Sequence, residues 1–421
     1  MMNSNYKPEK ILVDKGFDAD FSWDRINELC KLFSDDDLLQ SYVYKMHEHD
    51  KALDLKRGEF YPELLRSIIS IKRSVSSLYG IDVTQVQPNF GSNGSIDTIL
   101  SAVKVEETKR LNQWANTMTQ RLHNTVSTFR NKTSSESTFA EIETILLLER
   151  RQGGALFTSP TYFRNYNSAS AKDLIIHLVP LTENHQLDTQ AFINAMLQLQ
   201  PSIVFLVTPN NPTGLPIPDH DLLCILDKLP QDAWALIDRT LVNTKPEISS
   251  RDLLHRYADK NVVILHSFSK YRGMSHHRIG VALYSNPVMA NVVQPHLPLG
   301  IGLEGCLKAN RMVLQDGGIF PSGHIISNIK ENNALLRSFV TDFPDFDFTD
   351  FSGNYCLVML PRLLSSQNVC NLLYKRGLYV MGGHEFPEPN QSLLRLHTGG
   401  PPEYIKLFCS IVSKMAGDSR L

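Results

Sequence analysis

Short apolar runs alternate with polar and helical stretches between about residues 155 and 285. The runs contain 4 to 7 residues, and each is followed by a turn and a segment with helical spacing. This order predicts buried parallel strands joined by helices, as in an α/β sheet, and a ligand is expected at the carboxyl ends of such strands. The predicted strands are Gly154–Thr158, Asp173–Leu178, Ser202–Val207, Trp234–Ile237 and Asn261–Ser267.

The pattern changes after about residue 300. A long helical stretch near residues 324–340 precedes further short apolar runs, an α+β texture that predicts a second domain. These runs predict strands at Cys356–Leu360, Leu378–Met381 and Leu393–His397. We therefore expect a large α/β domain with a mainly parallel sheet over residues 56–300 and a smaller α+β domain over residues 301–421.

Other helical segments flank or interrupt these domains. Residues 1–55 predict an N-terminal helical arm, which we expect to pack with the small domain. Residues 63–79 repeat apolar positions at helical spacing and end at Gly80, a common helix-stopping residue. The charged helical stretch at about 103–145 contains a polar run at 131–137, and it is predicted to be an insertion in the large domain.

Composition excludes several classes of protein. The chain has 421 residues with 42 Lys and Arg against 44 Asp and Glu, so it has no charge excess that would attract nucleic acid or an anionic membrane. Its apolar runs are far shorter than the roughly 18 residues that a membrane span requires. Six cysteines without a C-x-x-C pair indicate reduced thiols rather than disulfides or a metal site. With no secretory signal, we expect a cytoplasmic protein.

Residues 266–280, HSFSKYRGMSHHRIG, follow the last strand predicted for the large domain. They place the hydroxyl groups of Ser267 and Ser269, the amine of Lys270 and the guanidinium group of Arg278 near its carboxyl end. A hydroxyl group and an arginine can bind a phosphate dianion, and a lysine beside them can form an imine with an aldehyde. The segment alone is also compatible with a polar turn, because short motifs often occur by chance.

Three other segments add to this predicted site. Asn211, in NNPTG, and Asp238, in LIDRT, each follow an apolar run, so both face the same end of the sheet. A buried carboxylate such as that of Asp238 requires a partner, and a pyridinium nitrogen is one. In FGSNGSID, residues 90–97, glycines open a helix predicted from Thr98 onward, and a helix N-terminus favours a phosphate.

These four motifs, in this order, resemble those of the class I/II aminotransferase family, which are fold-type I enzymes dependent on pyridoxal 5'-phosphate (PLP). The sequence pattern is most similar to that of histidinol-phosphate aminotransferases. The resemblance covers roughly residues 55–100 and 150–400. It implies the fold-type I PLP-dependent transferase fold, PLP as the cofactor, and transfer of an amino group between an amino acid and a 2-oxo acid.

The resemblance also implies roles for individual residues. Lys270 is expected to hold PLP as a Schiff base and to move the proton of the substrate. Asp238 is expected to pair with the ring nitrogen, and Asn211 to bind the ring hydroxyl group. The phosphate is expected to bind to Ser267, Arg278 and the backbone of Gly94, Ser95 and Ile96. Ser269 is a further implied cofactor-binding residue.

Further residues match the family's substrate and subunit contacts. Tyr162 resembles the aromatic residue that stacks on the ring, and Tyr61 resembles the tyrosine lent to the neighbouring subunit's phosphate, which implies a homodimer. Arg395, in LLRLHTGG, resembles the arginine that binds the α-carboxylate of the substrate. Arg164 and Asn354 are either contacts for the substrate side chain or surface residues. The implied partners are small molecules and a second copy, with no nucleic acid or membrane.

Leu241 departs from the family pattern, because the family usually has a tyrosine there that donates to the ring hydroxyl group. A decarboxylase, lyase or cyclase on the same fold therefore stays open beside the aminotransferase. His276 stands where the family commonly has glycine, and it and His277 are either active-site groups or ordinary loop residues.

Two other functional classes are disfavoured. A sensor fused to a DNA-binding module is disfavoured because residues 1–60 carry no basic recognition helix. A dinucleotide-dependent dehydrogenase is disfavoured because FGSNGSID is not G-x-G-x-x-G.

Overall fold

A computed structural model describes most of the chain from residue 60 onward. The described ranges are 60–129, 153–244, 247–271, 273–297, 301–316, 323–386 and 389–418. They belong to the compact unit Ser70–Leu421, apart from the beginning of helix α4 (Phe60–Tyr79), which belongs to the unit Met1–Ile69. The predicted N-terminal arm, residues 1–55, lies outside the described residues.

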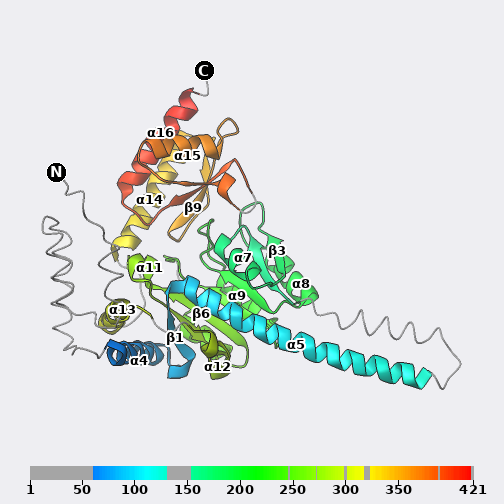
Figure 1. Cartoon of the computed structure of the whole chain (residues 1–421). Coiled ribbons are helices and arrows are strands. Elements are labelled where there is room, and N and C mark those ends of the chain that lie inside the picture. Colours follow the sequence, from blue (N-terminus) through cyan, green and yellow to red (C-terminus); the bar gives the residue numbers. More distant parts are fainter. Residues whose placement is uncertain are drawn as a thin grey trace, which may run out of the picture. The chain divides into compact units, whose positions relative to one another are not determined.

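Seven strands form one sheet in the order β1-β7-β6-β5-β4-β2-β3 (Figure 1). From β6 to β3 all neighbouring strands are parallel, whereas β7 is antiparallel to both of its neighbours. Strands β2, β4 and β5 are buried along their whole length, as expected for parallel strands covered on both faces. The strands are β1 Val86–Asn89, β2 Ala155–Ser159, β3 Ile176–Pro180, β4 Ile203–Val207, β5 Trp234–Asp238, β6 Asn261–Ser267 and β7 Gly280–Tyr284.

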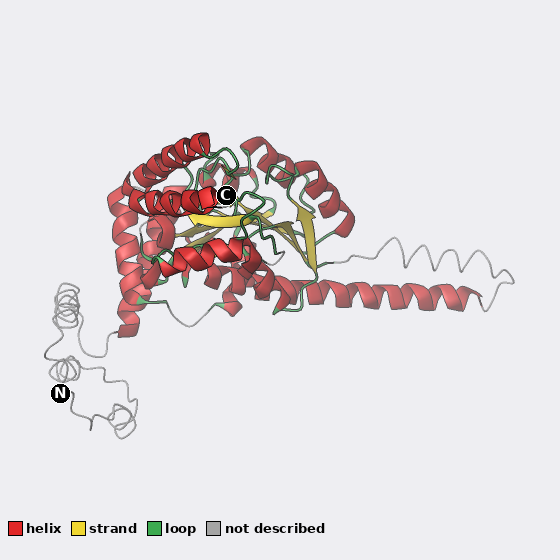
Figure 2. Ribbon diagram, turned by 90° about the horizontal axis from the view of Figure 1, so that it is seen from above, coloured by secondary structure: helices red, strands yellow, loops and turns green. Residues whose placement is uncertain are grey.

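Helix α5 (Gly91–Phe129) is the longest element of this region. Its first turns place Ile99, Leu100 and Val103 in the apolar core of the large sheet, and its later turns extend past the sheet (Figures 1 and 2). The other helices here are α7 Phe163–Ser170, α8 Thr189–Leu199, α9 Asp219–Asp227, α10 Ser250–Arg256, α11 Phe268–Tyr271 and α12 Pro287–Val293, with the short 3-10 helices η1 Val83–Gln85, η2 Ser275–His277 and η3 Gln294–His296.

A second, antiparallel sheet has the order β10-β11-β9-β8. Helices α14, α15 and α16 lie beside it (Figure 1), and residues such as Phe339, Val369 and Phe408 form its buried apolar core. The strands are β8 Asp347–Phe348, β9 Tyr355–Met359, β10 Met381–Gly382 and β11 Leu393–His397. The helices of this region are α14 Gly323–Asp342, α15 Ser366–Lys375, α16 Pro402–Asp418 and the 3-10 helix η4 Gly383–Glu385. Helix α13, Leu303–Asp316, packs against η2 instead.

The predicted α/β class, with a mainly parallel sheet and a smaller α+β region, is confirmed. Strand β3 begins at Ile176 rather than at the predicted Asp173, because Asp173 has a left-handed backbone with φ of 54° and ends the preceding turn. Strand β10 begins only at Met381, three residues after the predicted Leu378. None of the described helices is both long and apolar enough to cross a membrane.

The insertion predicted at about 103–145 is described as far as Phe129, where it continues helix α5. Residues 130–145, which include the polar run at 131–137, lie outside the described residues.

Candidate active site

Three of the predicted residues lie at the carboxyl ends of parallel strands. Asp238 is the last residue of β5, and Lys270 is in the single-turn helix α11, directly after β6. Asn211 follows β4 in the loop that ends at Gly214. Parallel strands end at the same edge of a sheet, so the fold brings an amine, a carboxylate and an amide to one side.

Asp238 is a buried carboxylate, with 4% of its surface exposed. Burial raises the pKa of this carboxyl group, although hydrogen bonds from Thr240 oppose the change. The N–H of Thr240 donates to Asp238 Oδ1 at 3.0 Å. Within the described ranges no lysine or arginine forms an ion pair with Asp238. A buried, charged carboxylate is costly without a cation, so a cationic group placed here would stabilise it.

Lys270 and Arg395 meet around the ring of Tyr355. Lys270 Nζ donates a hydrogen bond to Tyr355 Oη at 3.2 Å. The guanidinium carbon of Arg395 lies 4.6 Å from the centre of the Tyr355 ring, within the range of a cation–π interaction. Residues from the carboxyl edge of the large sheet and from the small sheet therefore share one site.

Asn211 contacts Arg395 and lies beside Tyr162. Arg395 Nη1 donates to Asn211 Oδ1 at 3.1 Å. Tyr162, Asn211 and Arg395 line one small pocket, together with Met381 and Phe386. This pocket brings an aromatic residue, an amide and a guanidinium group together.

Helix α5 begins at Gly91, so the predicted start at Thr98 is wrong. Its first turn, Gly91–Gly94, carries the N–H groups that lack partners within the helix. Gly91 has a φ of +68°, and a Cβ on it would lie 2.9 Å from Arg278 Nη2. Gly280, the strand partner of Ser267, packs on the backbone of Gly91. The predicted phosphate-binding groups Ser267, Arg278 and the helix N-terminus are thus adjacent.

The remaining predicted cofactor-binding residues near the start of α5 and the end of β6 have other contacts. Ser95 and Ile96 lie in the second turn of α5, each with 2% of its surface exposed, and Ile96 packs in the core of the large sheet. The backbone N–H of Ser269 donates to Ser267 Oγ at 3.2 Å, which holds that hydroxyl group at the end of β6.

Two predicted residues, Asn354 and Arg164, contact other parts of the chain. The side chain of a third, Tyr61, is not described. Asn354 is buried, and its Oδ1 accepts from the N–H of Val242 at 2.7 Å, so its amide fixes the chain that follows β5. Arg164 is exposed, and its guanidinium carbon lies 5.9 Å from the centre of the Phe163 ring. Tyr61 is in helix α4, and its side chain lies outside the described part.

The two adjacent histidines occupy η2. His276 is exposed, whereas His277 lies against helix α13, where its Nε2 is 3.1 Å from Lys308 Nζ and its Nδ1 is 3.9 Å from Glu304 Oε2. Desolvation and the charge of Lys308 lower the pKa of His277. In the described part of the chain no group of three or more His, Cys, Asp or Glu residues could hold a metal ion.

Tyr355 and His397 adjoin the predicted residues Asn354 and Arg395, although neither is predicted from the sequence. They are partners in the β9–β11 register, and Arg395 lies two residues before His397, so all three side chains lie on one face of the small sheet. Their rings meet edge to face at 5.3 Å. His397 remains exposed, and partial desolvation together with the positive charges of Lys270 and Arg395 lowers the pKa of its imidazole. In the sequence, only His397 could have been found in this way, because it lies two residues after Arg395 in a predicted strand.

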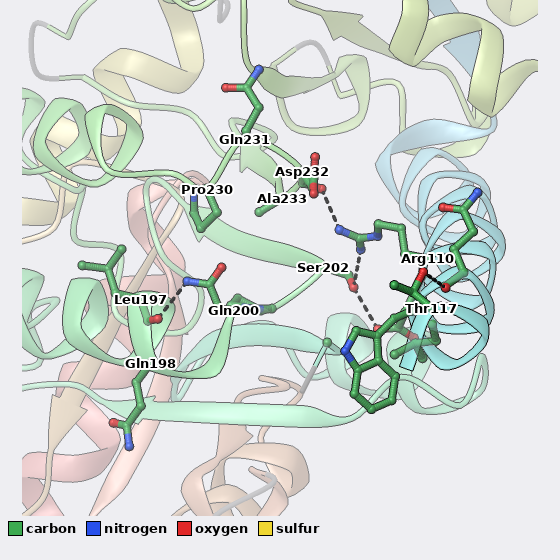
Figure 3. Close-up of a pocket in the computed structure, with 16 residues that line it drawn as sticks. Arg110, Thr117, Leu197, Gln198, Gln200, Ser202, Pro230, Gln231, Asp232 and Ala233 are labelled. Carbon is green, nitrogen blue, oxygen red and sulfur yellow. Dashed lines mark hydrogen bonds between the residues drawn. The ribbon is translucent and has the colours of Figure 1, made fainter. Parts of the chain in front are cut away.

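A larger cavity, of about 900 Å³, lies at the opposite edge of the large sheet. It is lined by residues that precede β2, β4 and β5, such as Ser202 and Asp232 (Figure 3). Arg110 donates to Ser202 Oγ at 2.8 Å and to the backbone carbonyl of Asp232 at 3.2 Å. Glu107 Oε1 in turn accepts from Ser202 Oγ at 2.9 Å. Arg110 and Glu107 are therefore both bonded to Ser202, and this cavity contains none of the predicted site residues.

Comparisons with known proteins identify a family and a fold. The sequence profile of the family described as "Aminotransferase class I and II" matches residues 133–412. A histidinol-phosphate aminotransferase from Vibrio vulnificus is 28% identical over 218 residues, which are 51% of this chain and 60% of that protein. The chain thus matches less than two thirds of the length of such curated relatives.

Two solved structures have the same fold. The histidinol-phosphate aminotransferase from Clostridium acetobutylicum superposes with a TM-score of 0.66, at 14% identity, over 90% of this chain and 96% of that one. The L-threonine-O-3-phosphate decarboxylase from Porphyromonas gingivalis gives a TM-score of 0.58, at 14% identity, over 84% of this chain and 92% of that one. At such low identity these likenesses establish the fold alone.

Proposed function

Because the chain belongs to the aminotransferase class I and II family, we propose that it is a PLP-dependent aminotransferase. It would transfer an amino group between an amino acid and a 2-oxo acid, with Lys270 as the Schiff-base lysine. The observation that carries the proposal is the joint placement of Lys270, Asp238 and the Asn211–Arg395 pair at one edge of the sheet.

The residues present suit each part of the cofactor. Buried Asp238 has a raised pKa and no cationic partner among the described residues, so a protonated ring nitrogen is the charge that it needs. Gly91 leaves room where a Cβ would meet Arg278, so a small anion can approach the helix N-terminus there. Ser267 adds a hydroxyl group at the same place, and Tyr162 offers a ring face.

When bound, PLP supplies an aldehyde for imine formation and a cationic ring that withdraws electrons from the substrate. Lys270 carries the nucleophilic amine, and once that amine is free it can accept and return a proton at Nζ. Arg395 binds the α-carboxylate of the substrate through its guanidinium group, which Asn211 and Tyr355 hold in place. This anchor fixes which bond at Cα faces the proton-transferring amine.

One observation favours a second reaction. Leu241, with 5% of its surface exposed, occupies the position of the family tyrosine and offers no hydroxyl group. The related fold from Porphyromonas gingivalis is described as a decarboxylase. A PLP-dependent decarboxylase, lyase or cyclase is therefore the alternative, in which another bond at Cα is broken.

The two reactions leave different products. We would load the protein with PLP, add single amino acids without an acceptor, and measure the amine form of the cofactor, the 2-oxo acid, carbon dioxide and ammonia. An aminotransferase accumulates the amine form together with one equivalent of 2-oxo acid. Carbon dioxide or ammonia without the amine form would refute the proposal. Lys270→Ala serves as the control, since it should give neither set of products.

The finer expectations from the sequence belong to the same proposal. They are a homodimer to which Tyr61 contributes a phosphate contact, a cytoplasmic location, and the domain boundaries at 55/56 and 300/301. Light scattering of the purified protein tests the dimer, because a monomer at micromolar concentration would exclude a shared phosphate site.

A further inference from the structure

Tyr355 contacts both cations of the candidate active site. Its hydroxyl group accepts from Lys270 Nζ at 3.2 Å, and its ring face lies 4.6 Å from the guanidinium carbon of Arg395. The two contacts use different parts of one side chain, so they can be removed separately.

The fold holds Tyr355 firmly from both sides. Tyr355 is the first residue of β9 and pairs with His397 of β11, which places its ring next to Arg395. Its carbonyl oxygen lies only 1.7 Å from the position that a Cβ on Gly214 would take. Gly214 has a φ of +71° and ends the loop that carries Asn211, so this loop packs directly on the start of β9.

We propose that Tyr355 is a positioning residue that aims the amine of Lys270 through its hydroxyl group and supports the guanidinium group of Arg395 through its ring. The inference rests on the proposed function and goes beyond it, because it gives this chain a phenol beside the reactive lysine although Leu241 supplies none. A hydroxyl group that holds the amine in one direction reduces the freedom lost when the amine attacks a carbonyl carbon.

Two variants separate the two contacts. Tyr355→Phe removes the hydroxyl group and keeps the ring, whereas Tyr355→Leu removes both. The first readout is the rate at which the cofactor-free protein captures added PLP, followed by absorbance. The second is the ratio of the rates at which aminooxyacetate and O-methylhydroxylamine displace Lys270 from the bound cofactor, because only aminooxyacetate has a carboxylate for Arg395.

We expect Tyr355→Phe to slow PLP capture about 3- to 10-fold, the effect of one lost hydrogen bond, and to leave the ratio within about twofold. Tyr355→Leu should slow capture by a similar factor and also lower the ratio about 3- to 30-fold, because the cation–π contact is lost. Tyr257→Phe is the matched control, since it removes a tyrosine hydroxyl group bonded to Asp227, and it should change neither readout.

Each result that differs from these expectations would refute a different part of the proposal. Unchanged capture by a folded Tyr355→Phe protein would overturn the role of the hydroxyl group. An equal fall of the ratio in both variants would overturn the role of the ring. A wild-type protein that captures no PLP, or that shows a ratio near one, would instead refute the proposed function itself and this inference with it. Thermal unfolding of each variant shows that the fold is retained.

Discussion

Replacing Asp238 by asparagine should affect the protein in opposite directions with and without cofactor. The carboxylate is buried and receives a hydrogen bond from Thr240, which the asparagine Oδ1 can also accept. The substitution therefore removes the charge and keeps the shape. Without cofactor no lysine or arginine of the described residues pairs with that charge, whereas with cofactor it would face a protonated ring nitrogen.

Without cofactor, the direction of the stability change caused by Asp238→Asn follows from the raised pKa of Asp238. Because folding raises the pKa of Asp238 above its usual 3.8, the folded state binds the proton more tightly than the unfolded state does. The contribution of this group to stability therefore falls as pH rises from about 3.8 through the folded pKa, and it stays unfavourable above that range. At pH 7 to 8 the cofactor-free Asp238→Asn protein should thus melt at a higher temperature than the wild type.

With cofactor, the same substitution should be unfavourable, because it should weaken the binding of PLP. A charge-assisted hydrogen bond contributes about 1.5 to 3 kcal/mol, so its loss should raise the dissociation constant for PLP about 10- to 100-fold. Fluorescence titration with PLP measures the constant, and calorimetric melting of the cofactor-free protein measures the stability.

Glu107→Gln provides a matched control, because Glu107 is also a buried carboxylate, with 5% exposure, but lies at the opposite edge of the sheet. It should not change PLP affinity. If Asp238→Asn binds PLP within threefold of the wild type, Asp238 is not the partner of the ring nitrogen.

Three further substitutions test other parts of the site and fold. Gly91→Ala adds a Cβ that would lie 2.9 Å from Arg278 Nη2 at a φ of +68°, so PLP affinity in equilibrium dialysis should fall several-fold, and unchanged affinity would place the phosphate elsewhere. Glu107→Ala removes the acceptor of the Gly154 N–H, so urea denaturation should show a free energy of unfolding lower by about 1 to 3 kcal/mol, and a loss below 0.5 kcal/mol would contradict this contact. Arg395→Lys keeps the charge but loses the bidentate geometry, so KM for the amino acid should rise about tenfold or more while PLP absorbance stays the same; an unchanged KM would remove Arg395 from substrate binding.

The sequence predicts which residues lie at the carboxyl edge of the large sheet, because this placement depends on local pattern. Lys270, Asp238 and Asn211 each follow a buried apolar run, and a residue that follows a parallel strand lies at its carboxyl end whatever the rest of the chain does. The bounds of strands β6 and β11 also match the predicted residues, because each strand is a short apolar run with polar residues or turns on both sides.

Features that depend on distant contacts could not be predicted in this way. The contact between Lys270 and Tyr355 joins residues 85 positions apart, and it follows from how the small sheet meets the large one. The sequence predicts too late a start for α5 because glycines disfavour a helix by propensity. In the structure Gly91 begins the helix at a φ of +68°, where a Cβ would meet the distant side chain of Arg278. Asn354 stands beside Tyr355 in the chain, but its own amide is used to hold Val242.

The Schiff-base lysine can be identified directly. Borohydride reduction of the PLP-loaded protein fixes the cofactor to the lysine that carries it, and mass spectrometry of the digested protein locates the label. We predict that the label is on Lys270 and that Lys270→Ala retains none after the same treatment. A label on another lysine of the wild type, or a label that persists in Lys270→Ala, would contradict the assignment of the catalytic residue.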